Sequence, residues 1–243
     1  MKTAVITGAS GAIGGATVKK FISDGYFTVG QYNNGAEEIS ALKESLGADG
    51  GDLFFPFRAD LSRSDGVESL ADYVLENFGH TDALICNAGA DLYKLCSETE
   101  EKEWDYIFDV NVKSAFLLVK RFIPSMTERK SGSVLFTSSI WGVSGACMET
   151  AYSASKAALI GFGKALSKEL APSGITVNCL CPGVIDTKMN ARFDSEEKAD
   201  LIARTPLGRF GTPEEIADIA HYLCCRAPFI TGQAIVADGG FTV

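Results

Sequence analysis

Residues 3–14 read TAVITGASGAIG, a short apolar run that passes directly into a glycine-rich turn. The run Thr3–Thr7 has the length and β-branched content of a buried strand, and Ile13–Asp24 has the pattern of a helix. Glycines here permit a tight turn, and the free N–H groups of the helix N-terminus attract a pyrophosphate. The stretch predicts a dinucleotide-phosphate loop, although a turn that binds nothing can share the pattern. The loop residues predicted to bind the cofactor are Gly8, Ser10, Gly11, Ile13 and Gly14.

Short apolar runs alternate with helical segments along the chain. The expected strands are Thr3–Thr7, Phe27–Tyr32, Leu53–Arg58, Ala83–Asn87, Ser133–Ser138, Thr176–Cys181 and Ala234–Ala237. The expected helices are Ile13–Asp24, Ala36–Leu46, Asp65–Phe78, Glu101–Met126, Ala151–Leu170 and Pro213–Cys224. Strands that alternate with helices imply right-handed crossovers. We therefore predict an α/β fold, a doubly wound parallel sheet with helices on both faces, in one domain over residues 1–243.

The composition limits the classes of partner. The 243 residues are 46% hydrophobic, which is enough for one substantial core. The net charge is −9 and the basic residues are dispersed, so we expect no nucleic-acid partner. No run approaches the roughly 18 apolar residues of a membrane span, and the N-terminus reads as a strand rather than a signal peptide. We expect a cytoplasmic protein with no membrane partner.

The seven cysteines and two histidines show no metal-ligand or disulfide spacing. Cys179 and Cys181 lie in an expected strand, and Cys224 and Cys225 end an expected helix. Both pairs are expected to be small core residues in a reducing compartment. Because the histidines are far apart in sequence, we expect neither a metal site nor a Ser-His-Asp triad.

Tyr152 and Lys156 are four residues apart in the helix expected over Ala151–Leu170, and so share one of its faces. A phenol has a pKa of about 10, and a nearby ammonium group lowers that pKa because it favours the phenolate. A serine hydroxyl beside such a tyrosine, that of Ser139, can hold the same substrate oxygen. The pattern predicts a general acid/base, Tyr152, tuned by Lys156. The alternative is that both side chains lie on a solvated helix face.

The end of the second expected strand bears on the choice of cofactor. Enzymes that select NAD(H) usually carry an acid there, on the ribose 2′-hydroxyl, but this chain has Asn33 and Asn34. Glu37 and Glu38 are expected in the first turn of the next helix, where they suit its dipole. The missing acid removes repulsion of a 2′-phosphate, while no Arg or Lys nearby in the sequence attracts one. We expect NADP(H) to be favoured over NAD(H), with both asparagines near the ribose.

Further cofactor contacts are expected where other strands end, because dinucleotides bind at the carboxyl ends of parallel strands. Asp60 and Leu61 follow the third strand, at the level of the adenine, although Asp60 can instead cap the next helix. Small residues after the fourth strand, Asn87 and Gly89 among them, let the cofactor approach closely.

The sixth strand is followed by Pro182, Ile185 and Thr187, which are predicted to contact the cofactor. Thr187 can bind a carboxamide or cap the next helix. Residues 189–206 form a charged, helical excursion that carries Met189, Phe193, Leu201 and Ile202. This excursion is either a mobile lid over substrate or an ordinary amphipathic surface helix.

Asn111 lies within the long helix expected over Glu101–Met126, although asparagine is a poor helix former. A buried asparagine competes for backbone hydrogen bonds, so it can distort the helix locally and hold a water. An exposed position on the helix is the alternative.

Together these residues resemble the short-chain dehydrogenase/reductase family across the whole chain. The matching motifs are the Thr7–Gly14 loop, Asn87-Ala88-Gly89, Asn111, Ser139, Tyr152-x-x-x-Lys156 and Pro182-Gly183. The resemblance implies a seven-stranded Rossmann-type sheet, a nicotinamide cofactor and a homotetramer. It also implies that Tyr152 exchanges a proton with substrate, Ser139 orients the carbonyl, and Lys156 lowers the tyrosine pKa and holds the nicotinamide ribose. Asn111 would support a proton-relay water.

The chain departs from the family pattern at three places. Ala12 stands where the loop usually has glycine, which leaves a Gly8-x-x-Gly11-x-x-Gly14 spacing typical of the longer, extended members. Cys86 replaces the common first asparagine of Asn-Asn-Ala-Gly. The basic loop residue of many NADP-dependent members is absent, which weakens the expectation of NADP(H).

Within the family the chain is most similar to bacterial 3-oxoacyl-[acyl-carrier-protein] reductases, at residues 206–215, 229–233 and 238–240. Sugar and steroid dehydrogenases share these elements. The similarity implies reduction of a ketone to a secondary alcohol in fatty acid biosynthesis, on a small or acyl-carrier-bound substrate. Of the two carrier-docking positions in that group, Arg129-Lys130 match the first and Pro172-Ser173 do not match the second.

Ser139-Ile140-Trp141-Gly142, followed by Gly145-Ala146-Cys147, is also similar to reductases that complete the 5-aminopentanone modification of elongation factor P. Trp141 and Cys147 would then flank the substrate, unless Trp141 merely packs against the lid. Two other hypotheses are a non-catalytic dinucleotide sensor and a nucleotide-sugar epimerase. The intact Ser-Tyr-Lys set argues against the sensor, and the lack of a C-terminal substrate domain argues against the epimerase.

Overall fold

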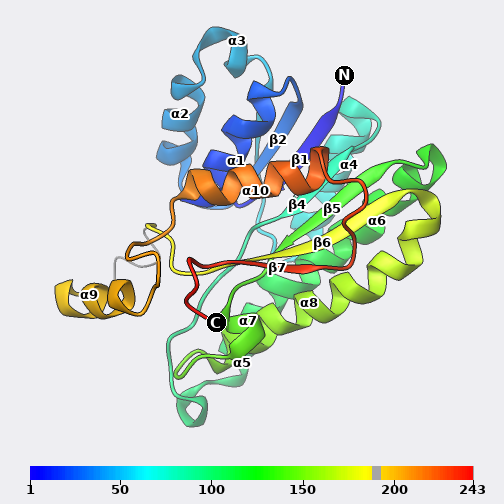
Figure 1. The fold of residues 1–243 in the computed structure, drawn as a ribbon. Coiled ribbons are helices and arrows are strands. Elements are labelled where there is room, and N and C mark those ends of the chain that lie inside the picture. Colours follow the sequence, from blue (N-terminus) through cyan, green and yellow to red (C-terminus); the bar gives the residue numbers. More distant parts are fainter. Residues whose placement is uncertain (188–192, 243) are drawn as a thin grey trace.

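The computed structural model describes residues 1–187 and 193–242. In this part of the chain the centre is a seven-stranded parallel sheet in the order β3-β2-β1-β4-β5-β6-β7 (Figure 1). The strands are β1 Thr3–Thr7, β2 Phe27–Tyr32, β3 Phe54–Arg58, β4 Ala83–Cys86, β5 Gly132–Thr137, β6 Ile175–Pro182 and β7 Ala234–Ala237. The expected strands are confirmed, and each end lies within one residue of the sequence prediction.

Helices cover both faces of the sheet (Figure 1). They are α1 Ala12–Ser23, α2 Ala36–Ser45, α3 Gly47–Gly51, α4 Ser64–Phe78, α5 Glu101–Phe108, α6 Ser114–Arg129, α7 Trp141–Ser144, α8 Thr150–Leu170, α9 Ser195–Ala203 and α10 Pro213–Cys225. Helices α1, α2 and α10 lie on one face, and α4, α6 and α8 lie on the other. None of the described helices has the length and apolar content needed to cross a bilayer.

Successive side chains of the buried strands point to opposite faces of the sheet, so each face has its own core. Val5 of β1 packs in one core with Leu70 of α4 and Phe122 of α6. Ile6, the next residue of β1, packs in the other core with Phe21 of α1. Burial of each such side chain stabilises the fold by about 1.5–3 kcal/mol. Continuous apolar strands therefore fit a sheet that is covered on both sides.

The strand order reverses between β1 and β4. From β1 the chain continues outward to β2 and β3 on one side, and from β4 it continues to β7 on the other. The reversal opens a crevice at the carboxyl ends of these strands, where doubly wound sheets bind ligands. The predicted fold class is confirmed, and the crevice locates the site.

The prediction of one continuous helix over Glu101–Met126 is wrong. Between α5 and α6 the chain forms a single π-helical turn, Asp109–Lys113, and Asn111 lies within it. The Asn111 side chain is buried, with 2% of the residue exposed, and it makes hydrogen bonds of its own. The expected local distortion is confirmed, and the alternative of an exposed Asn111 is wrong.

The excursion expected over residues 189–206 contains α9. Asp194 caps this helix, because its carboxylate accepts hydrogen bonds from the backbone N–H groups of Glu196 and Glu197 at 2.8 and 2.9 Å. Met189 lies outside the described residues.

Candidate active site

A cavity of about 820 Å³ opens at the carboxyl end of the sheet. Its wall collects most of the residues that the sequence predicts to bind a cofactor or to act in catalysis. Those on the wall are Gly8, Ser10, Gly11, Ile13, Gly14, Asn87, Gly89, Ser139, Trp141, Tyr152, Lys156, Pro182, Ile185 and Thr187. The fold therefore brings the segments that follow β1, β4, β5 and β6 together with α8 around one space.

The glycine turn after β1 has a compact backbone that leaves no room for side chains at Gly14. Gly8 has φ +70°, and a Cβ at Gly14 would lie 2.1 Å from the Gly8 carbonyl oxygen. The N–H of Gly11 donates to that same carbonyl at 3.0 Å. Helix α1 begins directly after Gly11, and no side chain of the described residues caps it. Its first N–H groups and the positive end of its dipole are thus directed at the cavity, which fits a dinucleotide pyrophosphate.

Lys156 is the buried cation of the site. Only 3% of the residue is exposed, and its Nζ donates to the Thr137 carbonyl at 2.8 Å. Burial lowers the pKa of Lys156 to about 8, because desolvation disfavours the ammonium form. The group still carries its charge at pH 7, the condition under which it acts on a neighbouring phenol.

Tyr152 and Ser139 share the cavity wall with Lys156. The Lys156 Nζ lies 5.5 Å from the centre of the Tyr152 ring, and both side chains come from the first two turns of α8. Ser139 follows β5, and its Oγ accepts a hydrogen bond from the Trp141 N–H at 3.1 Å. Tyr152 is 9% exposed and faces the cavity rather than bulk solvent. A phenol, a hydroxyl and an ammonium group therefore surround one reaction volume.

Ser138, which the sequence analysis does not single out, fixes α8 to the sheet. Its Oγ donates to the Lys156 carbonyl at 2.8 Å. A Cβ at Gly142 would lie 2.7 Å from the Lys156 carbonyl carbon, so glycine is required for this approach. The sequence signal that could have revealed this contact is the small polar Ser138 directly before Ser139, with Gly142 four residues after Ser138.

Asn111 joins the segment after β4 to α8. Its Oδ1 accepts from the Ala90 N–H at 2.8 Å, and its Nδ2 donates to the Ala90 carbonyl and to Ser155 Oγ, each at 2.9 Å. Ser155 Oγ donates in turn to the Tyr152 carbonyl at 2.7 Å. Asn111 lies behind the cavity wall and positions the helix that carries Tyr152; its role toward a relay water stays a prediction.

Four of the predicted cofactor residues do not line the cavity: Asn33, Asn34, Asp60 and Leu61. Asp60 Oδ1 accepts from both the N–H and the Oγ of Ser62, at 3.0 and 2.8 Å, so its carboxylate shapes the turn before α4. The Leu61 side chain is buried in the core. Both side chains thus have structural contacts that account for their positions.

No basic residue lies near the end of β2 in the sequence, but one does in the folded structure, so the expectation that none is available there is wrong. Strand pairing sets Arg58 of β3 beside Tyr32, and the Arg58 Nε donates to the Asn33 carbonyl at 3.1 Å. Glu38, in the first turn of α2 as expected, lines the cavity. A guanidinium and a carboxylate therefore both lie near the expected ribose position.

The outer end of the cavity is lined by Trp141, Glu149, Phe193 and Leu201. Trp141 also packs edge-to-face on Phe241, with ring centroids 5.7 Å apart. Leu201 belongs to α9, so the predicted excursion does border the cavity, whereas Ile202 is not on the wall.

Cys147 does not flank the cavity as expected. It is exposed and lies outside the lining residues, because the turn before α8 directs Glu149 to the wall instead. All seven cysteines are free thiols in the structure.

Comparison with known proteins places this geometry in a family. The family model described as enoyl-(acyl carrier protein) reductase matches residues 8–242. The uncharacterized oxidoreductase YmfI of Bacillus subtilis (strain 168) is 36% identical over 241 residues, which cover 99% of this chain and 98% of the relative.

Two 3-oxoacyl-[acyl-carrier-protein] reductases named FabG are similar over the whole chain. That of Thermotoga maritima is 33% identical over 243 residues, covering 100% of this chain and 98% of the relative. That of Staphylococcus aureus (strain N315) is 35% identical over 240 residues, covering 98% and 97%. The region that the family model matches, residues 8–242, contains the glycine turn and Ser139, Tyr152 and Lys156 of the cavity. The chain therefore belongs to the short-chain dehydrogenase/reductase family of NAD(P)-dependent oxidoreductases.

Proposed function

We propose that this protein reduces a ketone to a secondary alcohol with NADP(H), and that Tyr152 protonates the substrate oxygen. The observation that carries the proposal is the arrangement of Tyr152, Ser139 and a buried, cationic Lys156 on the wall that also holds the phosphate-type glycine turn. A sensor of dinucleotides has no need of such a set.

Each residue has a defined part in this mechanism. The nicotinamide, when bound, supplies a hydride to the ketone carbon. Ser139 donates a hydrogen bond to the carbonyl oxygen and orients it, and the Tyr152 hydroxyl gives that oxygen its proton. The Lys156 ammonium stabilises the phenolate that Tyr152 becomes. Asn111 holds α8 so that the phenol stays directed at the cavity.

The preference for NADP(H) is supported by Arg58. Its guanidinium lies at the end of β2, bonded to the Asn33 carbonyl, and guanidinium groups bind phosphate strongly. Glu38 on the cavity wall opposes a 2′-phosphate by charge. We propose that Arg58 outweighs Glu38, so that NADPH binds more tightly than NADH.

The substrate class follows from the FabG relatives, whose names specify 3-oxoacyl groups on an acyl carrier protein. We propose a 3-oxoacyl thioester, presented by a carrier that docks through Lys130. Arg129, the other matching basic residue, is already paired with Asp82. Such a substrate would place this protein in fatty acid biosynthesis in the cytoplasm.

A second substrate class is favoured by one observation. Besides Glu38, two further carboxylate residues, Asp91 and Glu149, line the cavity, and a wall of this charge favours a ketone that also bears an ammonium group. The 5-aminopentanone on elongation factor P is a ketone of this kind, with Trp141 as its apolar contact.

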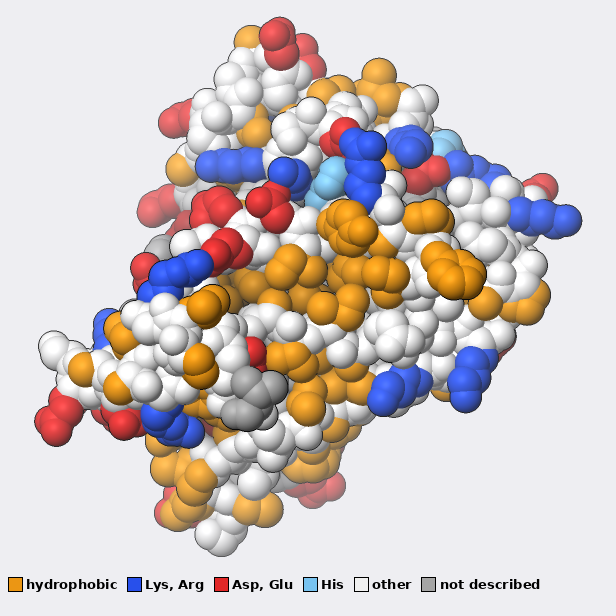
Figure 2. Space-filling view, in the orientation of Figure 1, with side chains coloured by type: hydrophobic (Ala, Val, Ile, Leu, Met, Phe, Trp, Pro, Cys, Tyr) orange, Lys and Arg blue, Asp and Glu red, His pale blue; other side chains and the backbone are white. Residues whose placement is uncertain are grey.

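An apolar surface supports a homotetramer. Figure 2 shows apolar side chains gathered over the side of α10 and β7, and Tyr222, Phe229 and Val236 are exposed there. A patch of this kind marks an interface between subunits. Light scattering coupled to gel filtration is expected to give a mass four times that of the chain.

The proposal is tested by single-turnover oxidation of NADPH with acetoacetyl thioesters, small ketones and amino-ketones. For whichever ketone proves to be a substrate, Tyr152→Phe is expected to slow its reduction by about 10²–10⁴-fold, because the hydroxyl that supplies the proton is lost while the ring remains. Tyr93→Phe, at an exposed tyrosine, is the control. An unchanged rate in Tyr152→Phe would refute the assigned acid, and cofactor binding without turnover of any ketone would favour the sensor.

A further inference from the structure

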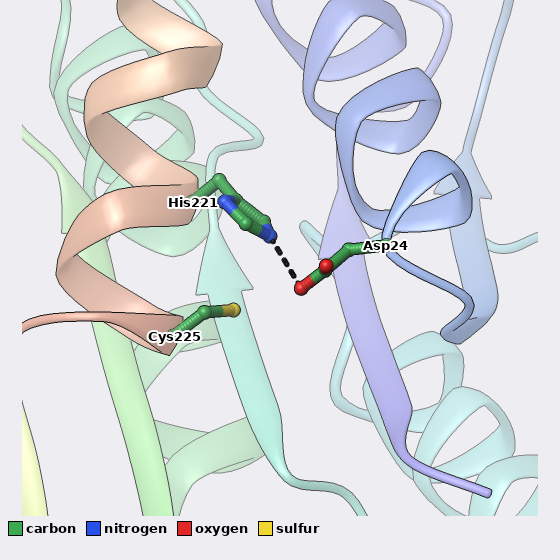
Figure 3. A group of neighbouring side chains, drawn as sticks. All are labelled: Asp24, His221 and Cys225. Carbon is green, nitrogen blue, oxygen red and sulfur yellow. Dashed lines mark hydrogen bonds and ion pairs between the residues drawn. The ribbon is translucent and has the colours of Figure 1, made fainter.

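A second group of reactive side chains lies away from the active site, where α1 ends against α10. Asp24 directly follows α1, and His221 and Cys225 are one turn apart on α10. Figure 3 shows the three side chains directed into the space between the two helices. One ligand atom from each, a carboxylate oxygen, a ring nitrogen and a sulfur, lie within 4.8 Å of one another.

The three ligand atoms are near enough to one another to bind one metal ion. His221 Nε2 and Asp24 Oδ2 are 3.0 Å apart, and the His221 side chain is only 9% exposed. Around zinc, with bonds of about 2.0–2.3 Å, neighbouring ligand atoms lie roughly 3.3–3.8 Å apart. The nitrogen and oxygen therefore need to separate slightly, and the sulfur needs to approach, movements that side-chain rotation provides.

The surroundings orient the ligands. Arg226 Nη2 donates to Asp24 Oδ1 at 3.3 Å, which leaves Oδ2 directed toward His221. The Tyr26 hydroxyl lies 3.3 Å from Cys225 Sγ, where it can donate to a thiolate. Such outer hydrogen bonds hold ligands in place and tune metal sites.

The charged groups around the cluster include some that attract a cation and some that repel it. The Asp24 carboxylate and a Cys225 thiolate balance the two charges of a divalent ion. Lys2 and Arg226 face the same space and oppose it. The site is thus selective for an ion that binds sulfur and nitrogen strongly, and a hard cation such as Mg²⁺ does not overcome the two basic groups.

An access route is present. An open cavity of about 310 Å³ borders the cluster, lined by Asp24 and Cys225 together with Lys2, Gly25, Tyr26 and Arg226. It has room for an ion to enter and for a water to remain as fourth ligand, as in zinc sites with three protein ligands.

We propose that Asp24, His221 and Cys225 bind a zinc-type divalent cation that fastens the end of α1 to α10. The thiol releases its proton to solvent on binding, and His221 coordinates through Nε2 with its ring proton on Nδ1. The three residues do not form a recognisable metal-binding motif in the sequence, because Asp24 and His221 are 197 residues apart.

The test uses the full-length protein after treatment with a chelator, titrated with Co²⁺ and then Zn²⁺. One Co²⁺ per chain is expected, with the thiolate-to-cobalt charge-transfer band that reports a sulfur ligand, and Zn²⁺ should displace it. Zinc should also raise the thermal midpoint. Cys225→Ser should abolish the band and weaken zinc binding by more than about 100-fold, since a direct ligand matters more than an outer-shell partner.

Matched controls come from the chain itself. His80 also pairs with a carboxylate, Asp82, at 3.3 Å, but it lies outside the cluster. His80→Asn and Cys96→Ser should therefore leave binding unchanged, whereas His221→Asn should weaken it. Asp24→Asn gives an independent test if Cys225→Ser does not fold, as judged by circular dichroism. A missing charge-transfer band, a band that survives Cys225→Ser, or equal losses in the His80 and His221 variants would overturn the proposal.

Discussion

The two ends of the active-site cavity are built in different ways. At the catalytic end, Ser139, Tyr152 and Lys156 come from one stretch of chain. The Ser138 hydroxyl and the Lys156 ammonium donate hydrogen bonds to backbone carbonyls and so tie α8 to the end of β5. At the other end, where we propose that the adenosine binds, Glu38 of α2 lines the cavity, and Arg58 lies at the end of β2 because β2 pairs with β3. A local motif can be recognised from spacing, whereas a charge delivered by strand pairing cannot.

The largest effect is expected at Lys156. Lys156→Met should lower kcat/KM for ketone reduction by about 10²–10⁴-fold, because the phenolate of Tyr152 loses its counter-charge. In the wild-type protein the ammonium is present below the Lys156 pKa of about 8 and lost above it. The kcat/KM profile, which reports the free enzyme, should therefore fall as pH rises through about 8.

Lys156→Arg distinguishes the charge from other causes of this fall. Because a guanidinium stays protonated well above pH 8, the decline near that pH should disappear, whatever the rate at neutral pH. A fall that remains in Lys156→Arg would assign it to another group and would weaken the electrostatic account of the catalytic end.

The second-largest effect is expected at Asn111, whose side chain bonds to α8, the helix that carries Tyr152 and Lys156, on the side away from the cavity. Asn111→Ala removes three hydrogen bonds, one buried and two partly buried, and should lower the free energy of unfolding by about 2–4 kcal/mol. Urea denaturation measures this change. Asn77→Ala, at an exposed asparagine in α4, should change stability by less than about 0.5 kcal/mol. Equal changes in both variants would contradict the positioning role of Asn111.

Gly14 tests the turn that both ends of the cavity share. A Cβ there meets the Gly8 carbonyl oxygen at 2.1 Å, so Gly14→Ala should displace the turn and weaken NADPH binding by about 100-fold. Gly161 of α8 is the matched control, because nothing lies within 4 Å of its added Cβ. Gly161→Ala should retain full affinity and gain about 0.5–1 kcal/mol of stability. Calorimetric titration and thermal unfolding give the two readouts.

The smallest effect is expected at the adenosine end. Arg58→Met should raise the KM for NADPH by about tenfold, the loss of one charge-assisted contact, and leave that for NADH unchanged. Glu38→Gln should act in the opposite sense and favour NADPH. Arg63→Met is the control, because Arg63 is exposed and pairs with Asp65. If Arg58→Met changes both cofactors alike, the long-range assignment of cofactor preference is wrong.

Sequence reasoning succeeded where the signal is local. The strand ends were predicted within one residue, because apolar runs with glycine or asparagine boundaries define buried strands. The helix over residues 101–126 was predicted as continuous, because helical periodicity carries no sign of one extra residue in a π turn. The side-chain bonds of Asn111 become visible only once α8 packs beside it.

The same limit explains why some predicted site residues do not line the cavity. Asp60 and Leu61 follow the third strand as expected, but the Asp60 side chain bonds within the turn before α4 and the Leu61 side chain packs in the core. Cys147 follows Trp141 closely in the sequence, yet the turn before α8 directs Glu149, not Cys147, to the wall. Position along a loop does not determine the direction of a side chain.

The amino-acid sequence by itself determined the alternation of strands and helices, the glycine turn and the i,i+4 pair of Tyr152 and Lys156. Each of these depends on residues within one or two helical turns, so periodicity and spacing reveal them. Only the tertiary structure decided that Lys156 is buried with a lowered pKa, that Arg58 lies beside Asn33, and that Asp24 meets His221 and Cys225. Desolvation and contacts between distant segments exist only after the chain has packed.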